Sequence, residues 1–270
     1  MKAKVGDIEI YYELTGEGYP LALIEGMGYS SWMWFKQRPA LSRHFQLLIY
    51  DNRGVGLTDK PRDVYTIRQM ADDLAGLLDA LGIEGCHVMG ISMGGFIAQE
   101  FALAYPDRVA GLILGCTSYG GPNTLPMPQD TLQALLDVEG LTQEQVYRQG
   151  MATAMTEGYF KSAPDEIDQI VAWRLENPQP RYAWINQFNA GAGHDTEDRI
   201  DQIKAPALVA HGQHDAVVPA ENGRRLAAAL GATFNLYDAG HLFFIEQADQ
   251  YNLDTTTFLK EIEQSKGLEL

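Results

Sequence analysis

Residues 86–95 read CHVMGISMGG, a short apolar run that leads into a glycine-rich turn. The run at 86–89 predicts a buried strand, and residues 94–105 have the spacing of a helix that Pro106 ends. Ser92 stands between them in the pattern G-x-S-x-G, where a side chain at either glycine would clash with the tight turn. We therefore expect its hydroxyl to project from the carboxyl end of the strand.

The same alternation of strand and helix continues on both sides of this turn. Residues 66–81 carry apolar side chains at helical spacing, and Gly82 suits a C-cap just beyond them. The other expected elements are hairpin-like strands within 5–12, strands at 20–25, 45–51, 109–116, 207–212 and 233–237, and helices near 220–230 and 245–260. This order predicts an α/β fold with a mostly parallel central sheet flanked by helices.

Residues 119–200 interrupt the alternation. The segment opens with Gly120, Gly121 and Pro122. It then shows only helical patterns, near 132–136, 146–155, 167–175 and 182–188. We predict that residues 119–200 form a helical cap inserted into one domain, whose core is made of residues 1–118 and 201–270.

A serine hydroxyl becomes a good nucleophile only when a neighbouring base takes its proton. Without such a partner, the pattern around Ser92 would be a glycine-rich turn with a capping serine. The histidines that follow it are His194, His211, His214 and His241. We expect His241 to be the base, because it lies on a loop between the predicted strand 233–237 and the last helix. His211 and His214 are rivals near the preceding strand end, where His211 suits a structural hydrogen bond, and His194 lies in a polar loop of the insertion.

The base must in turn be held in one tautomer by an acid. Asp215 follows the predicted strand 207–212 on a loop at the same edge of the sheet, and it is the expected acid. Asp238, three residues before His241, is the competitor. It lies beside the base, whereas an orienting acid is expected opposite it.

Several segments together resemble the α/β-hydrolase superfamily. They are YDNRGVG at 50–56, GISMGG at 90–95, the run 212–219 around Asp215, and Gly240-His241. They match its order and spacing over almost the whole chain, and the sequence most resembles small bacterial carboxylesterases and the 3-oxoadipate enol-lactonase-like group. The resemblance implies the α/β-hydrolase fold and the chain order nucleophile, acid, base. It implies no particular substrate, because the superfamily uses one triad for many reactions.

The resemblance also implies an oxyanion hole made by the backbone N–H groups of Met27 and Met93. The superfamily usually carries His-Gly after its third strand, whereas this chain has Glu25 before Gly26. A carboxylate near an anionic intermediate is unfavourable unless it is protonated, paired or turned away. We expect Glu25 to be a structural group, with Arg53 as a candidate partner.

Aromatic and sulfur-containing side chains gather around the expected site. Trp32 follows the oxyanion loop, and the insertion adds Met151, Met155, Tyr159, Phe160, Trp173, Trp184 and Phe188. In the resembling families such an insertion is a cap whose lining selects the substrate, which suggests a small to medium apolar one. More than half of these residues are expected to pack cap against core. Trp32 is the candidate substrate-binding residue.

Composition limits the expected partners. Among 270 residues, 36 are acidic and 20 basic, and the net charge of −16 disfavours nucleic acid and anionic membranes. No signal-peptide or membrane-spanning pattern occurs, so we expect a cytoplasmic protein of undetermined oligomeric state. Cys86 and Cys116 lie in apolar runs and suit small buried hydrophobes. No cluster has metal-ligand spacing, so no metal or cofactor is implied.

These features predict a serine hydrolase that cleaves a carboxylic ester or lactone through an acyl-enzyme. Transfer of the acyl group to peroxide or another acceptor, as in a cofactor-free haloperoxidase-like perhydrolase or an acyltransferase, would use the same triad. A carbon–carbon bond hydrolase and a ligand-binding protein without turnover also stay open. A haloalkane dehalogenase is disfavoured, because its nucleophile is an aspartate and this chain has Ser92.

Overall fold

The central strands bury both of their faces, because their apolar side chains alternate between the two sides of one sheet. In the computed structural model, which describes residues 1–268, Ala22 and Ile24 pack into one hydrophobic cluster. Leu21 and Leu23 of the same strand pack into the other. This two-sided burial is typical of a parallel sheet covered by helices.

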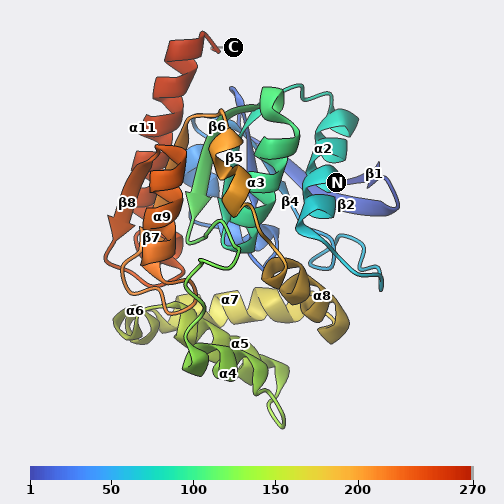
Figure 1. Cartoon of the computed structure of the whole chain (residues 1–270). Coiled ribbons are helices and arrows are strands. Elements are labelled where there is room, and N and C mark those ends of the chain that lie inside the picture. The colour runs from blue at the N-terminus through green and yellow to red at the C-terminus, as the bar shows by residue number, and fades with distance from the viewer. Residues whose placement is uncertain (269–270) are drawn as a thin grey trace.

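The sheet has eight strands in the order β1-β2-β4-β3-β5-β6-β7-β8 (Figure 1). The strands are β1 (Lys2–Val5), β2 (Ile8–Thr15), β3 (Pro20–Ile24), β4 (Gln46–Tyr50), β5 (Cys86–Ile91), β6 (Val109–Gly115), β7 (Ala207–Gly212) and β8 (Thr233–Tyr237). Strand β2 pairs antiparallel with β1 and β4, and every pairing from β4 across to β8 is parallel. The predicted mostly parallel central sheet is confirmed.

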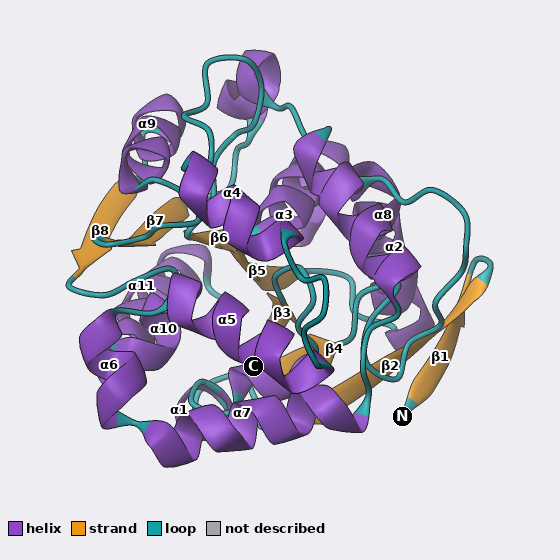
Figure 2. Cartoon of the chain, turned by 90° about the horizontal axis from the view of Figure 1, so that it is seen from below, coloured by secondary structure: helices purple, strands orange, loops and turns teal. Residues whose placement is uncertain are grey.

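Helices cover both faces of this sheet. The α-helices are α1 (Arg38–Leu41), α2 (Ile67–Leu81), α3 (Met93–Ala104), α4 (Gln129–Leu136), α5 (Gln143–Ala154), α6 (Glu157–Ser162), α7 (Pro164–Glu176), α8 (Arg181–Ala192), α9 (Ala220–Leu230), α10 (Phe243–Glu246) and α11 (Ala248–Lys266). Short 3-10 helices are η1 (Ser31–Trp34), η2 (Pro106–Arg108) and η3 (Glu197–Gln202). Helices α2, α3 and α9 lie on one face, and α1, α10 and α11 on the other (Figure 2).

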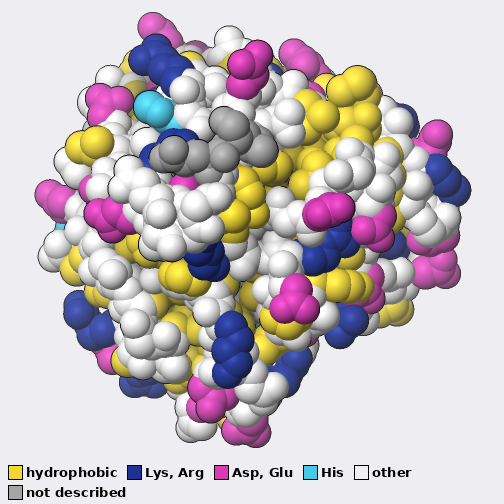
Figure 3. All heavy atoms as spheres, turned by 90° about the horizontal axis from the view of Figure 1, so that it is seen from above, with side chains coloured by type: hydrophobic (Ala, Val, Ile, Leu, Met, Phe, Trp, Pro, Cys, Tyr) yellow, Lys and Arg dark blue, Asp and Glu magenta, His cyan; other side chains and the backbone are white. Residues whose placement is uncertain are grey.

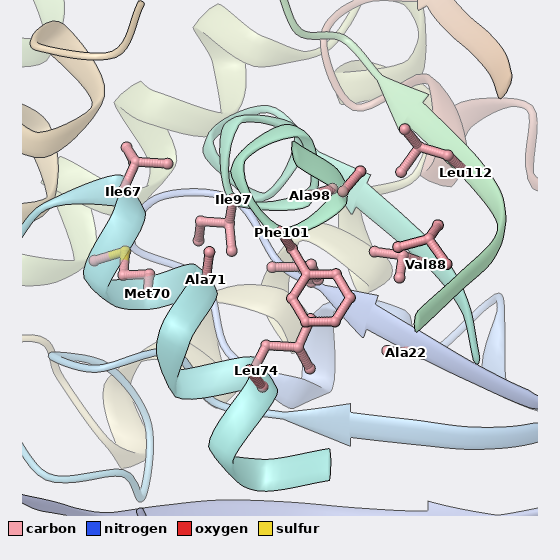
Figure 4. Packing of buried hydrophobic residues seen from close by; sticks show 14 of the residues in the cluster. Ala22, Ile67, Met70, Ala71, Leu74, Val88, Ile97, Ala98, Phe101 and Leu112 are labelled. Atoms are coloured by element: carbon pink, nitrogen blue, oxygen red, sulfur yellow. The ribbon is translucent and has the colours of Figure 1, made fainter. Parts of the chain in front are cut away.

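Helix α2 shows why these residues form this element. Thr66 caps its start by accepting a hydrogen bond from the N–H of Gln69, and Gly82 ends it in the left-handed conformation at φ 68°. Its apolar stripe packs on α3, where the fully buried ring of Phe101 lies near Leu74 and Val88 (Figure 4). The packing of α2 against α3 therefore covers the strand that carries the predicted nucleophile.

Helices α4 to α8 follow β6 in the chain and lie together at the end of the sheet where β6 and β7 terminate (Figure 1). The two ends of the segment that carries them meet. Gly120 and Asp195 form an isolated β-bridge, and the N–H of Thr196 donates to the carbonyl of Tyr119 at 2.8 Å. The helical character expected for 119–200 is present, and α6 is an additional helix. The role of the segment as a cap stays a prediction.

The end of the chain differs from expectation in one respect. The single predicted helix near 245–260 is two helices, α10 and α11, with a break at Gln247. No helix within residues 1–268 is long and apolar enough to cross a membrane. On the face opposite α4 to α8, acidic and basic side chains are interspersed (Figure 3).

Replacing Phe101 by Ala should lower the free energy of unfolding by about 3–5 kcal/mol, because the change leaves a cavity in the fully buried layer between α2, α3 and β5. Chemical denaturation monitored by circular dichroism measures this loss. Leu253→Ala is the control, because this α11 side chain is 59% exposed and should change stability little. Equal effects of the two substitutions would contradict the described packing.

Candidate active site

Ser92 lies on a strained turn between β5 and α3. Its φ of 56° and ψ of −119° are rare for a residue with a side chain. The flanking glycines are needed. A Cβ atom on Gly90 would lie 2.1 Å from the carbonyl oxygen of Gly94, and one on Gly94 would lie 2.1 Å from that of Ile24. The N–H of Ser92 donates to Gly115 at 2.8 Å, which ties the turn to β6.

Asp215 follows β7, and its carboxylate is held at both oxygens. Oδ1 accepts hydrogen bonds from the N–H groups of Val217 and Val218, each at 2.8 Å. Oδ2 lies 2.7 Å from Nδ1 of His241. An ionised carboxylate can only accept, so Nδ1 carries the hydrogen and Nε2 of His241 is left as the proton acceptor.

His241 lies on the loop between β8 and α10, and the backbone on each side of it is anchored. The N–H of Gly240 donates to Oε1 of Glu246 at 2.9 Å. The N–H of Leu242 donates to the carbonyl of Ala154 at 3.0 Å. The end of α5, within the inserted segment, therefore braces the loop that carries this histidine.

Burial and charge act in opposite directions on Asp215 and His241. Burial raises the pKa of Asp215, but His241 and the other hydrogen-bond donors outweigh it and hold this pKa at about 2. Burial lowers the pKa of His241, but the charge of Asp215 and the contact with Cys116 raise it well above the ordinary 6.5. Asp215 is therefore ionised at neutral pH and stabilises the protonated ring of His241.

Ser92 and His241 line the same cavity, of about 100 Å³. Its other walls come from the core and from α4, α5, α7 and α8, and they include Met27, Tyr29, Leu135, Arg174, Trp184 and Leu242. Within the described residues, no hydrogen bond joins the hydroxyl of Ser92 to His241. Such contacts are often long before a substrate binds.

The two residues predicted for the oxyanion hole flank Ser92. Met27 follows β3 and lines the cavity, and Met93 is the first residue of α3. In the described part of the chain, neither backbone N–H donates to another protein group. A Cβ atom on Gly26 would lie 3.4 Å from that of Ser92, so the Met27 loop passes close to the hydroxyl. The amino end of α3 adds a positive potential there.

Glu25 is fully buried beside this loop, with Oε1 accepting from the N–H of Asn52 at 2.5 Å and Oε2 without a partner. Burial, followed by the charge of Asp51, raises its pKa well above the ordinary 4.5. The candidate partner was wrong, because Arg53 binds Asp73 with 2.6 Å between Nε and Oδ2. The raised pKa favours the protonated acid, which carries no charge that would oppose an anionic intermediate.

The competing residues lie outside the cavity. His214 and Asp238 bond each other at 2.8 Å on the surface. His194, expected in a polar loop, is buried instead. His211 lies at the end of β7, and its Nε2 is 3.1 Å from Oδ2 of Asp215. The structure thus brings Ser92, Asp215 and His241 together and leaves their rivals apart from the cavity.

Cys116 is a site residue that the sequence reasoning missed. It follows β6 with a positive φ of 41°, and donor atoms of Cys116, Asp215 and His241 lie within 4.8 Å of one another. Burial raises the pKa of its thiol, which therefore stays protonated beside His241. Its place at the end of a predicted strand, at the same sheet edge as Ser92, was the available signal.

Trp32 does not line the cavity that contains Ser92. It borders an open surface groove with Phe35 and Trp173, and it stacks on Trp173 with 5.9 Å between ring centroids. The tryptophan that lines the cavity is Trp184 of α8. We therefore replace Trp32 by Trp184 as the candidate substrate-binding residue.

Comparison with known proteins agrees with this architecture. A family model described as the alpha/beta hydrolase fold matches residues 19–248. The chain therefore belongs to the alpha/beta hydrolase family, as the resemblance in its sequence implied.

Its relatives include the 2-hydroxy-6-oxononadienedioate/2-hydroxy-6-oxononatrienedioate hydrolase of Paraburkholderia xenovorans (strain LB400), 30% identical over 269 residues that cover 94% of this chain and 91% of the relative. The solved enol-lactonase from Burkholderia xenovorans LB400 has a TM-score of 0.86 and 28% identity, covering 96% and 100% of the two chains. A thermophilic esterase from Thermogutta terrifontis has a TM-score of 0.81 and 30% identity, covering 97% and 99%. These names describe different substrates, so the similarity shows family and fold.

Replacing Glu25 by Gln should leave turnover of a short ester unchanged, because a neutral amide keeps the shape of a protonated acid. The raised pKa also means that the folded state holds this proton after the unfolded chain has lost it, so wild-type stability falls as pH rises above the ordinary 4.5. The Tm of Glu25→Gln should therefore rise relative to that of the wild type as the pH increases.

Thermal melts across pH, together with ester kinetics, measure both effects. Glu17→Gln, at an exposed carboxyl, is the matched control and should show no pH-dependent gain. Loss of turnover in a folded Glu25→Gln variant would show that the acid itself is needed.

Proposed function

We propose that this protein is a serine hydrolase in which Ser92 is the nucleophile, His241 the base and Asp215 the orienting acid. The observation that carries the proposal is the 2.7 Å contact between Asp215 and His241 beside a cavity that also holds Ser92. The strained turn at Ser92 adds support, since backbone strain of this kind clusters at functional sites. The substrate is a carboxylic ester or lactone of small to medium size.

The reaction proceeds through an acyl-enzyme. Ser92 Oγ attacks the carbonyl carbon while Nε2 of His241 takes its proton, and His241 then returns that proton to the leaving alkoxide. A water molecule, deprotonated by the same nitrogen, attacks the acyl-enzyme and releases the acid and the Ser92 hydroxyl. The ionised Asp215 supports the charge on His241 in both halves of the reaction.

The negative charge that develops on the carbonyl oxygen is met by the N–H groups of Met27 and Met93. Both donors are free of protein acceptors in the described part of the chain, and both belong to backbone that flanks Ser92. Losing one such donor typically lowers the rate by about 10²–10³-fold. Glu25, being protonated, does not oppose this charge.

Arg174 refines the expectation of an apolar substrate. It lines the cavity, and Nη2 donates to the carbonyl of Gly28 at 3.4 Å. Among the described residues its buried Nε has no hydrogen-bond partner and no carboxylate pairs with the guanidinium. Its guanidinium lies over the rings of Tyr29 and Tyr147, at 4.8 and 4.1 Å from their centroids. We infer that the substrate carries a carboxylate that reaches Arg174, which is consistent with the dioate named for one relative.

A carbon–carbon bond hydrolase is the second candidate, because the same relative is named for that type of substrate. A carboxylate-bearing vinylogous diketone distinguishes the two activities. Loss of its absorbance faster than hydrolysis of esters of similar size would favour this candidate.

Ser92→Ala should lower hydrolysis of a p-nitrophenyl ester by about 10⁴-fold or more, because the acyl-enzyme can no longer form. It should also abolish labelling by a fluorophosphonate probe. Ser265→Ala, at an exposed serine on α11, is the control and should behave as the wild type. Ester hydrolysis retained by Ser92→Ala would overturn the proposal.

Arg174→Met should lower kcat/KM for the p-nitrophenyl half-ester of glutaric acid by at least about tenfold, since a charged hydrogen bond is lost. The neutral p-nitrophenyl pentanoate has a similar length and should be hydrolysed as before. Arg174→Lys, which keeps the charge, should recover part of the loss. An equal effect of Arg174→Met on both esters would contradict a carboxylate subsite.

A further inference from the structure

His211 makes a contact with Asp215 that the proposed mechanism does not use. The side chain is fully buried at the end of β7. Its Nε2 lies 2.9 Å from the carbonyl oxygen of Val218 and 3.1 Å from Oδ2 of Asp215. Both neighbours are acceptors, so Nε2 must carry the ring hydrogen.

The other ring nitrogen completes this assignment. Nδ1 of His211 is buried and has no hydrogen-bond partner among the residues that the structure describes. A hydrogen on Nδ1 would be an unsatisfied buried donor, which is costly, so the geometry favours a ring hydrogen on Nε2. His211 is therefore a fixed N–H donor that points at the loop containing Asp215.

The surroundings of the ring are shaped to hold it in this position. Gly223 of α9 packs against it so closely that a Cβ atom would lie 2.3 Å from Nδ1. The Val218 carbonyl accepts from Nε2 while the Val218 N–H donates to Asp215 Oδ1. The backbone of Val218 thus contacts both the His211 ring and the Asp215 carboxylate, one through its carbonyl and the other through its N–H.

We propose that His211 is a positioning residue for Asp215: its one Nε2 hydrogen is shared between the Val218 carbonyl and Oδ2 of Asp215, so that it holds the Asp215–Val218 loop and adds a fourth donor to the carboxylate. The inference rests on the proposed function, in which Asp215 orients the base. Oδ1 accepts from two backbone N–H groups. Oδ2 lies within hydrogen-bond distance of Nδ1 of His241 and of Nε2 of His211. With all acceptor positions engaged, the carboxylate cannot rotate away from His241.

The contact has a second, electrostatic effect. A donor on Oδ2 makes that oxygen less basic, and hydrogen bonding from His211 is among the causes that lower the pKa of Asp215. Without it, Oδ2 would stabilise protonated His241 more strongly. Within residues 1–268, the other titratable group that contacts His241 is Cys116 at the end of β6, and α9 presents Gly223 to His211. Removing the donor should therefore move the acidic limb of the kcat/KM profile to higher pH.

The test compares His211→Met with His211→Gln. The two side chains have similar length and volume, but only Gln offers an N–H donor near the position of Nε2. We expect His211→Met to lower kcat by about 10- to 100-fold with KM unchanged, and to move the acidic limb of the kcat/KM profile to higher pH. His211→Gln should restore most of the kcat and most of the position of the limb. His214→Met, at an exposed histidine of the same loop, should leave kcat and the limb as in the wild type.

Equal losses in the Met and Gln variants would assign the effect to packing and overturn the proposal, as would an unchanged His211→Met enzyme. Gly223→Ala gives an independent variant, because it keeps the imidazole but displaces it, and it should reproduce the loss of kcat. Thermal melts establish that each variant is folded.

A proton NMR measurement separates this proposal from the proposed function. The downfield N–H resonance between His241 and Asp215, identified by its loss in Asp215→Asn, reports the contact without turnover. It should shift in His211→Met and return in His211→Gln. An unshifted resonance in His211→Met would overturn the positioning role even if the enzyme hydrolyses esters. Failure of the hydrolase proposal would appear separately, as retained activity in Ser92→Ala.

Discussion

Helix α3 lies directly against β3 because Gly94 has no side chain at a point where a Cβ atom would be 2.1 Å from the carbonyl of Ile24. This close approach brings the amino end of the helix beside the loop that follows the strand. Ser92 must then adopt its strained backbone conformation, and the loop of Gly26 and Met27 lies close to it at the wall of the same cavity. The geometry of the site therefore depends on a steric requirement of the backbone more than on any single polar contact.

Two buried carboxyl groups near this turn illustrate how local donors determine charge. Asp215 is nearly fully buried, which raises its pKa, yet this pKa lies at about 2 because the charge of His241 and hydrogen bonds from His211 and His241 outweigh burial. Glu25 is also buried, but it has one donor from Asn52 and a nearby like charge, and its pKa moves upward. The same side-chain chemistry thus supplies a permanent anion in one place and a neutral structural group in the other.

The sheet, its helical crossovers and the turn at Ser92 could be predicted from the sequence, because each is encoded by a local pattern of apolar residues and glycines. The placement of Asp215 and His241 followed from the resemblance and from their positions after strands. Contacts made over long chain separations leave no such pattern. The expected partner of Glu25, Arg53, therefore binds Asp73 instead, and Trp184 lines the cavity where Trp32 was expected. The break at Gln247 and the position of Cys116 likewise depend on tertiary packing.

The meeting of Gly120 with Asp195 has a consequence for how this molecule can change. Because the segment between them leaves and re-enters the sheet at nearly one point, its length and sequence can vary with little effect on the pairing of β6 with β7. Closing a longer loop across that point adds only a slowly growing entropic cost. Ser92, Asp215 and His241 all follow strands of the sheet, whereas α4, α5, α7 and α8, which supply the other walls of the cavity, belong to this one closed segment.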